Sequence, residues 1–236
     1  MSASRSRQQR REAARRRARA TPSPRLGAGT TEPSATRRSR AVEVAVIIAL
    51  ALGLAFVIQA TLVKTYRIPS GSMEPTLAIG QRVLVNRIGM HFGAPKVGDI
   101  VVFHPPQGAD ETPPICDDLT AGAGTSRLCG RATDAHSKQA FIKRVVAVGG
   151  DRISVRDGHV TRNGRPERDG YIRPCSPRGF GCGNYPAIEI PKGTFFLMGD
   201  NRGGSDDARF WGPVKRSWIV GKAFVTYWPP DRIGIP

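Results

Sequence analysis

The chain has 236 residues and is poor in the side chains that bind metals or act as bases, with four histidines, four cysteines and seven lysines. It contains no HExxH motif, no GxSxG motif and no glycine-rich phosphate loop, which argues against zinc proteases of that type, α/β-hydrolases and nucleotide-binding enzymes. A Ser-His-Asp triad is compatible with the counts, but no local pattern points to one. Because no cysteine pair has CxxC spacing and no histidine lies at zinc-finger distance, neither a metal nor a cofactor is expected.

Acidic side chains are also scarce, since 19 Asp and Glu stand against 36 Lys and Arg, giving a formal net charge of +17. Residues 1–40 hold 12 arginines and two glutamates (net +10), and the other 196 residues hold 24 basic and 17 acidic side chains (net +7). More than half of the net positive charge therefore lies in residues 1–40, an Arg-rich tail. This tail is predicted to be disordered because it has few large apolar side chains. No nucleic-acid partner is expected, although a membrane-anchored module that binds RNA or anionic lipid through this tail is an alternative.

Residues 41–63 are predicted to form a single transmembrane anchor. Between Glu43 and Lys64 lie 20 residues without a charge, and a helix of that length spans about 30 Å, the thickness of the hydrocarbon core of a bilayer. The preceding arginines place the N-terminus in the cytoplasm, so residues 64–236 are expected on the extracytoplasmic side of the cell membrane. A buried core helix, a cleaved signal peptide and an organellar transit sequence are the alternatives.

The four cysteines suit an exported body, where disulfides form and persist. Cys116 and Cys129 are 13 residues apart, and Cys175 and Cys182 are seven apart, each pair within a Gly/Pro-rich stretch. This spacing favours pairing within each stretch, although the sequence alone allows three connectivities.

The exported body, residues 64–236, is predicted to be mostly β, with antiparallel sheets or a barrel-like arrangement. Short β-branched runs recur between turn signals such as Asp157-Gly158 and Asn163-Gly164, and no amphipathic helix of ordinary length follows residue 65. Residues 104–139 and 165–187 are polar, Pro/Gly-rich insertions into this pattern.

Four segments of the body contain groups that could carry chemistry: residues 68–77, 98–103, 141–146 and 199–212. The first holds a Pro-Ser-Gly-Ser-Met run, which alone could be a turn or a helix N-cap. The third places Lys143 in an apolar strand, on the same face as Phe141 and Val145. Burial of that face would lower the lysine pKa and favour the neutral amine, whereas on an edge strand the ammonium group would reach water.

Taken in order, these segments resemble the sequence boxes of bacterial type I signal peptidases, the membrane-anchored Ser-Lys proteases of protein export. The excess of 29 arginines over seven lysines is typical of a GC-rich source such as an actinobacterium. The chain departs from the family pattern at Gly203-Gly204 and at Ala208. Mitochondrial inner-membrane peptidases share the dyad and are an alternative, whereas the soluble Ser-Lys autoproteases lack an anchor.

The resemblance implies an acyl-enzyme mechanism with Ser72 as nucleophile and Lys143 as general base. It implies an oxyanion hole formed by the Ser70 hydroxyl and the Ser72 amide, and a Ser205 hydroxyl that orients the lysine. Two supporting ion pairs are also implied, Asp207 with Arg209 and Asp200 with Arg144.

The resemblance further implies that the substrates are exported preproteins, whose signal peptides are cut after small residues at −3 and −1. The substrate would bind as an added strand. Its partners would then be signal peptides, the lipid bilayer and the vicinity of the export translocon. The side chains expected to line its shallow apolar pockets are Ile68, Pro69, Met73, Leu77, Phe141 and Ile142.

Overall fold

A computed structural model describes residues 35–89, 93–176 and 181–236. The chain divides into two compact units, Met1–Leu50 and Ala51–Pro236. Helix α2 (Ala35–Thr61) has exposed apolar side chains from Val42 to Leu54. In the described part of the chain, no helix meets the length and hydropathy needed to cross a membrane. Most of the predicted tail, residues 1–34, lies outside the described residues, and its last six residues belong to α2.

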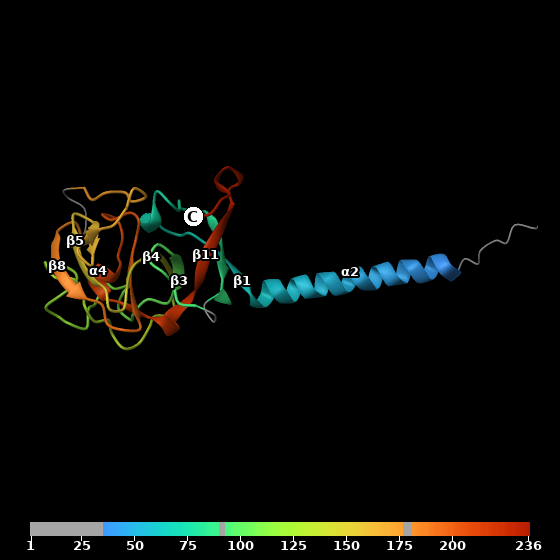
Figure 1. Cartoon of the computed structure of the whole chain (residues 1–236), viewed down its shortest axis with the longest axis horizontal. Helices are drawn as coiled ribbons and strands as arrows, with labels where there is room; N and C mark the ends of the chain where they lie inside the picture. The colour runs from blue at the N-terminus through green and yellow to red at the C-terminus, as the bar shows by residue number, and fades with distance from the viewer. Residues whose placement is uncertain (1–34, 90–92, 177–180) are drawn as a thin grey trace, which may run out of the picture. The chain divides into compact units, whose positions relative to one another are not determined.

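The larger sheet of the body has seven strands, which pair antiparallel throughout in the order β1-β2-β11-β3-β4-β9-β10. Figure 1 labels β1, β11, β3 and β4 of this sheet. The β-branched runs of the sequence become these strands, as their propensity for a pleated, half-buried surface predicts. The strands are β1 (Val63–Arg67), β2 (Arg82–Asn86), β3 (Ile100–Phe103), β4 (Phe141–Val148), β9 (Thr194–Met198), β10 (Val214–Lys215) and β11 (Ile219–Trp228).

The smaller sheet has the order β7-β6-β5-β8 and is also antiparallel. Two tight turns join its strands, and Asp157 and Asn163 have positive φ there together with the glycine that follows each, as type I′ hairpin turns require. The sheet takes its last strands from the predicted insertion 165–187. Its strands are β5 (Arg152–Arg156), β6 (His159–Arg162), β7 (Arg165–Pro166) and β8 (Asn184–Glu189). The prediction of a mostly β body built from antiparallel sheets is therefore confirmed.

Short helical segments complete the described body: α4 (Ala208–Trp211) and the 3₁₀ turns η1 (Gly71–Met73), η2 (Arg216–Trp218) and η3 (Pro230–Arg232). Strand β3 is buried along its whole length, because its two faces contact different apolar clusters. Val101 and Phe103 belong to the larger cluster, whereas Ile100 and Val102 belong to a smaller one beside η1. The sheet therefore separates two cores, and β4 lies next to β3 between them.

Both insertions are closed by disulfides, Cys116 with Cys129 and Cys175 with Cys182. These are the two pairs that the spacing favours. The first insertion contains no strand and the second contributes β7 and the start of β8.

Candidate active site

Ser72 and Lys143 are 71 residues apart in the sequence, and their side chains are in contact. Ser72 lies in the single turn η1, and Lys143 is the third residue of β4, where its backbone pairs with Val101 of β3. The Lys143 Nζ atom lies 2.6 Å from Ser72 Oγ and donates a hydrogen bond to it. A serine hydroxyl in direct contact with an amine is the arrangement that nucleophilic catalysis by a Ser-Lys pair needs.

The side chain of Lys143 lies in a buried environment, with the residue only 4% exposed. Burial is the largest influence on its pKa and lowers it from 10.5 to about 8, although the carboxylates of Asp207 and Asp206 oppose this effect. Lys143 therefore points to a buried face of β4, and its amine does not reach bulk water. Its amine can lose its proton near neutral pH and can then accept one.

Ser70 precedes η1 and lies at its N-cap position, where its side chain makes no capping hydrogen bond. Its hydroxyl instead donates to Ser72 Oγ over 3.4 Å. Two hydroxyl groups thus lie side by side next to the Lys143 amine, and the Ser70 hydroxyl is not used to satisfy the backbone.

A loop that follows β9 holds the Ser72 turn in place. The Asn201 backbone N–H donates to the Ser72 carbonyl over 3.1 Å, and Asn201 Nδ2 donates to the Gly71 carbonyl over 3.0 Å. Gly199 lies so close to this turn that a Cβ atom there would overlap Ser205 Oγ and the Ser72 carbonyl oxygen. Gly199 is therefore required for the close approach of the loop to the turn.

Arg144 and Asp200 form the first of the two ion pairs expected around the site. Arg144 Nε and Nη2 donate to the two oxygens of Asp200 over 2.9 and 2.7 Å, and Thr76 Oγ1 donates to Asp200 over 2.6 Å. Asp200 is fully buried, so this bidentate pair ties β4 to the loop after β9.

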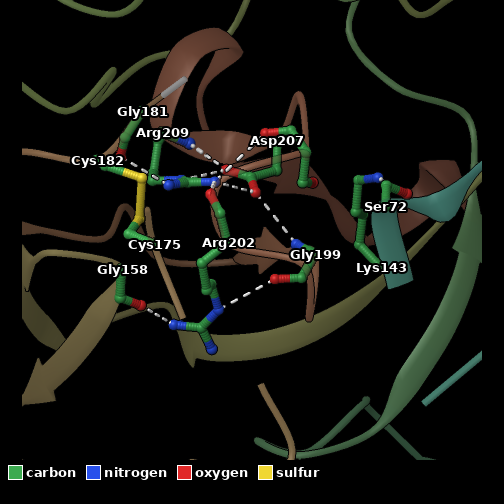
Figure 2. Close-up of polar contacts among 11 residues, drawn as sticks. Ser72, Lys143, Gly158, Cys175, Gly181, Cys182, Gly199, Arg202, Asp207 and Arg209 are labelled. Carbon is green, nitrogen blue, oxygen red and sulfur yellow. Dashed lines mark hydrogen bonds and ion pairs between the residues drawn. A yellow bond between two sulfur atoms is a disulfide. The ribbon is translucent and has the colours of Figure 1, made fainter. Parts of the chain in front are cut away.

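Asp207 and Arg209 form the second pair, with distances of 2.8 Å from Nε to Oδ1 and 2.9 Å from Nη2 to Oδ2 (Figure 2). Asp207 Oδ2 also accepts the Gly199 N–H over 3.1 Å. Burial alone would raise the pKa of Asp207, but Arg209, together with Lys143 and the Gly199 N–H, outweighs this effect and holds the pKa below its ordinary value. The carboxylate therefore stays ionised and fixes Gly199 next to Ser72.

Both disulfide-closed insertions contact Arg209. Arg209 Nη1 donates to the Gly181 carbonyl over 2.8 Å, within the Cys175–Cys182 loop. The Cys129 N–H donates to the Arg209 carbonyl over 3.0 Å. The insertions thus hold the loop that carries Asp207, as the left side of Figure 2 shows for the second one.

Ser205 does not make the contact that the resemblance implies. It is 2% exposed, and its Oγ packs beside Gly199 without a hydrogen bond to any described residue. The expected hydrogen bond to Lys143 is therefore not formed in this structure.

A cavity of about 440 Å³ opens next to Ser72 and Lys143. Of the side chains expected to line it, Ile68, Pro69, Phe141 and Ile142 do so. Met73 and Leu77 do not. Both are fully buried in the smaller apolar cluster, because the η1 turn directs them into the core beneath Ser72.

One side of the cavity is a free strand edge. Residues 141–143 of β4 pair with β3 on one side, but the pairing of β4 with β9 begins only at Arg144. In the described part of the chain, no strand pairs with the other edge of residues 141–143. Their backbone groups can therefore receive an extended peptide.

The sequence model of the family described as "Signal peptidase, peptidase S26" matches residues 41–228 of the chain. The chain belongs to this family. Its relatives are serine endopeptidases, and the Ser72–Lys143 contact and the peptide-sized cavity lie within the matched region.

Several curated members of the signal peptidase family are similar to the chain. Signal peptidase I of Leptolyngbya laminosa is 35% identical over 181 residues, covering 77% of this chain and 76% of that protein. Probable signal peptidase I-1 of Synechocystis sp. is 36% identical over 181 residues, covering 77% and 79%. Probable signal peptidase I of Mycobacterium leprae is 31% identical over 226 residues, covering 77% and 74%. A solved signal peptidase I from Enterococcus faecalis is 22% identical, with 55% of this chain and 97% of that chain covered and a TM-score of 0.38.

Two residues of this signal peptidase family member are not singled out by the sequence alone, Asn201 and Arg202. Asn201 holds the Ser72 turn as described above. Arg202 is fully buried, and its Nε donates to the Gly199 carbonyl over 3.0 Å while its Nη1 donates to the Gly158 carbonyl (Figure 2). Their position inside the segment 199–212, which resembles the family, is the signal that could have found them.

Proposed function

We propose that the chain removes the signal peptides of exported preproteins with Ser72 and Lys143 as a catalytic dyad. The observation that carries this proposal is the 2.6 Å contact between a serine hydroxyl and a buried lysine amine in a cavity with a free strand edge. Family membership supplies the substrate class, and the geometry suggests how the peptide is bound and cut.

The first step is attack on the scissile carbonyl. The neutral amine of Lys143 accepts the proton of the Ser72 hydroxyl as Oγ bonds to the carbonyl carbon. The oxygen of the resulting tetrahedral intermediate becomes negative, and the Ser70 hydroxyl and the Ser72 amide are the proposed donors to it. Losing one such donor typically lowers the rate by about 10²–10³-fold.

The second step breaks the C–N bond. Lys143, now protonated, gives its proton to the leaving amine of the mature protein, and the acyl group remains on Ser72 Oγ. A water molecule then loses a proton to Lys143 and attacks the ester, which releases the carboxylate of the signal peptide and restores the Ser72 hydroxyl. Each proton is taken and returned by the same amine.

The substrate is proposed to add an extended strand along the free edge of β4. Its small side chains at −1 and −3 would then meet Ile68, Pro69, Phe141 and Ile142, which line the cavity. The cavity volume of about 440 Å³ must hold several residues of the peptide, which supports selection of small side chains.

Ser205 is proposed to orient the neutral Lys143 amine during the reaction. Its buried hydroxyl has no hydrogen-bond partner among the described residues, although buried polar groups in native proteins are almost always satisfied. Two ion pairs would hold the loop after β9 and strand β4 in position around the dyad, Asp207 with Arg209 and Asp200 with Arg144.

Residues 41–63 are proposed as the membrane anchor, preceded by a cytoplasmic tail (1–40) and followed by the protease domain (64–236) on the extracytoplasmic side. The 20 uncharged residues after Glu43, the exposed apolar side chains of α2 and the arginines before it support this topology. The two disulfides support an oxidising compartment for the body. In this position the enzyme would act at the bilayer, near the export translocon.

A cleavage assay with a synthetic signal peptide and the full chain in detergent tests the dyad. We expect Ser72→Ala and Lys143→Met to abolish cleavage at the predicted bond, because each removes one member of the pair. Lys138→Met is the matched control, since Lys138 is an exposed lysine outside the cavity. Full activity in either dyad variant would contradict the proposal.

A further inference from the structure

The first insertion contributes a wall of the cavity. Its two ends continue the β3–β4 pair outward through a bridge between Pro106 and His136, and the Gln107 N–H donates to the Ala135 carbonyl over 2.9 Å. This irregular ribbon brings Ala109, Asp110 and Gln139 into the lining of the cavity that also holds Ser72 and Lys143. The insertion is therefore part of the peptide-binding surface.

Asp110 presents a carboxylate at this wall. Ala109 is 1% exposed and belongs to the larger apolar cluster, which fixes the main chain next to it. The Asp110 side chain is exposed, and its Oδ2 accepts a hydrogen bond from Gln139 Nε2 over 3.2 Å. Arg67 also lines the cavity, but no ion pair joins it to Asp110, so the carboxylate can attract an external cation.

The hydrogen bond to Gln139 places Asp110 beside the segment that leads into the N-terminal end of β4. Gln139 lies in a bend two residues before the start of β4 and precedes Lys143 by four residues. A peptide that adds parallel to β4, with residue −1 at Ser72 and Lys143, advances along the strand residue for residue, so its preceding residues extend toward Gln139. Its residues −4 and −5 therefore come level with Gln139 and Asp110.

We propose that Asp110 is a specificity-determining residue that favours signal peptides with a basic side chain at −4 or −5 and disfavours an acidic one. This inference rests on the proposed function, because it takes the position of the peptide from it. An exposed ion pair changes an equilibrium by at most about fivefold, so attraction of lysine and repulsion of glutamate together change kcat/KM by about twofold to thirtyfold.

Three synthetic signal peptides test the proposal, identical except for Lys, Gln or Glu at −5, with a second set varied at −4. For the wild type we expect kcat/KM to decrease from Lys to Gln to Glu in at least one set, with a Lys/Glu ratio of about fivefold at low salt that shrinks as salt screens the pair. Asp110→Asn should bring the ratio close to one. Asp110→Lys should invert it.

Glu111→Gln is the matched control, since Glu111 is the neighbouring exposed carboxylate and does not line the cavity. It should keep the wild-type ratio. A wild type without Lys/Glu discrimination in both sets, or a ratio that Asp110→Asn and Asp110→Lys leave unchanged, would overturn the role of Asp110. Failure of the wild type to cut even the Gln peptide would instead contradict the proposed function, so the two failures are distinguishable.

Discussion

The burial of Lys143 predicts where activity is lost on acidification. Burial lowers its pKa from 10.5 to about 8, and only the neutral amine can accept the proton of Ser72. We therefore expect kcat/KM to fall as the pH drops through about 8, and to fall about tenfold per pH unit below that. The loss is on the acidic side because the protonated amine is the inactive form.

The magnitude follows from the fraction of neutral amine. At pH 7 a lysine with a pKa of about 8 is neutral in about one molecule in ten, whereas at its ordinary pKa it would be neutral in about three molecules in 10,000. Burial of Lys143 thus increases the reactive fraction at pH 7 by roughly 300-fold. That factor corresponds to about 3 kcal/mol, a large part of what general-base catalysis needs.

The assay is the pH profile of kcat/KM for an uncharged signal peptide, measured from about pH 6 to 10 at constant ionic strength. Asp206→Asn provides the perturbation, because the Asp206 carboxylate raises the pKa of Lys143, and its removal should move the acidic limb to lower pH. Asp206→Glu keeps the charge and should leave the limb close to its wild-type position. An acidic limb of the kcat/KM profile centred near the ordinary lysine pKa would refute the reasoning, and so would a shift of that limb to higher pH in Asp206→Asn.

Three further predictions concern stability and packing. Lys143→Met should be inactive yet more stable than the wild type at pH 7 by up to about 3 kcal/mol in urea unfolding, because it removes a buried charge. This difference in stability should shrink from pH 8 to 10.5, because in that range the folded wild type holds the neutral amine while its unfolded chain still binds the proton. Gly199→Ala should lower kcat by at least about 100-fold, since its Cβ would overlap the Ser72 carbonyl, with far-UV circular dichroism as the check on folding. Asp200→Asn should lower the free energy of unfolding by about 3 kcal/mol, because it leaves the Arg144 guanidinium buried without its counter-charge, and urea unfolding measures this loss.

The sequence indicates those parts of the site in which a residue type is unusual for its local pattern, such as a charged side chain within an apolar strand. Burying a lysine in an apolar strand is costly, so Lys143 stands out among its neighbours, but its role and that of Ser72 follow from the resemblance to the family. The short β-branched runs likewise predict the strands, and Gly/Pro-rich spacing favours the two disulfide pairs.

What could not be predicted depends on how irregular segments pack. The resemblance implies that Met73 and Leu77 line the cavity, but their apolar character predicts only burial and does not say whether a core or a substrate covers the side chain. The contacts of the Ser205 hydroxyl could not be predicted either, because they depend on how closely Gly199 approaches the η1 turn. The position of Asp110 is set by hydrogen bonds across a segment without strand or helix periodicity, so no local pattern indicates it.

The separation of Ser72 from Lys143 along the chain also bears on folding. The two side chains are 71 residues apart, and the Asn201 contact with Gly71 joins segments 130 residues apart. Contacts of such long range form slowly, since large loops must close before they are made. The nucleophile, its base and the loop that holds them therefore come together only when nearly the whole body has folded. Recovery of cleavage during refolding should consequently follow completion of the tertiary structure, and an incomplete chain emerging from synthesis has no working protease site.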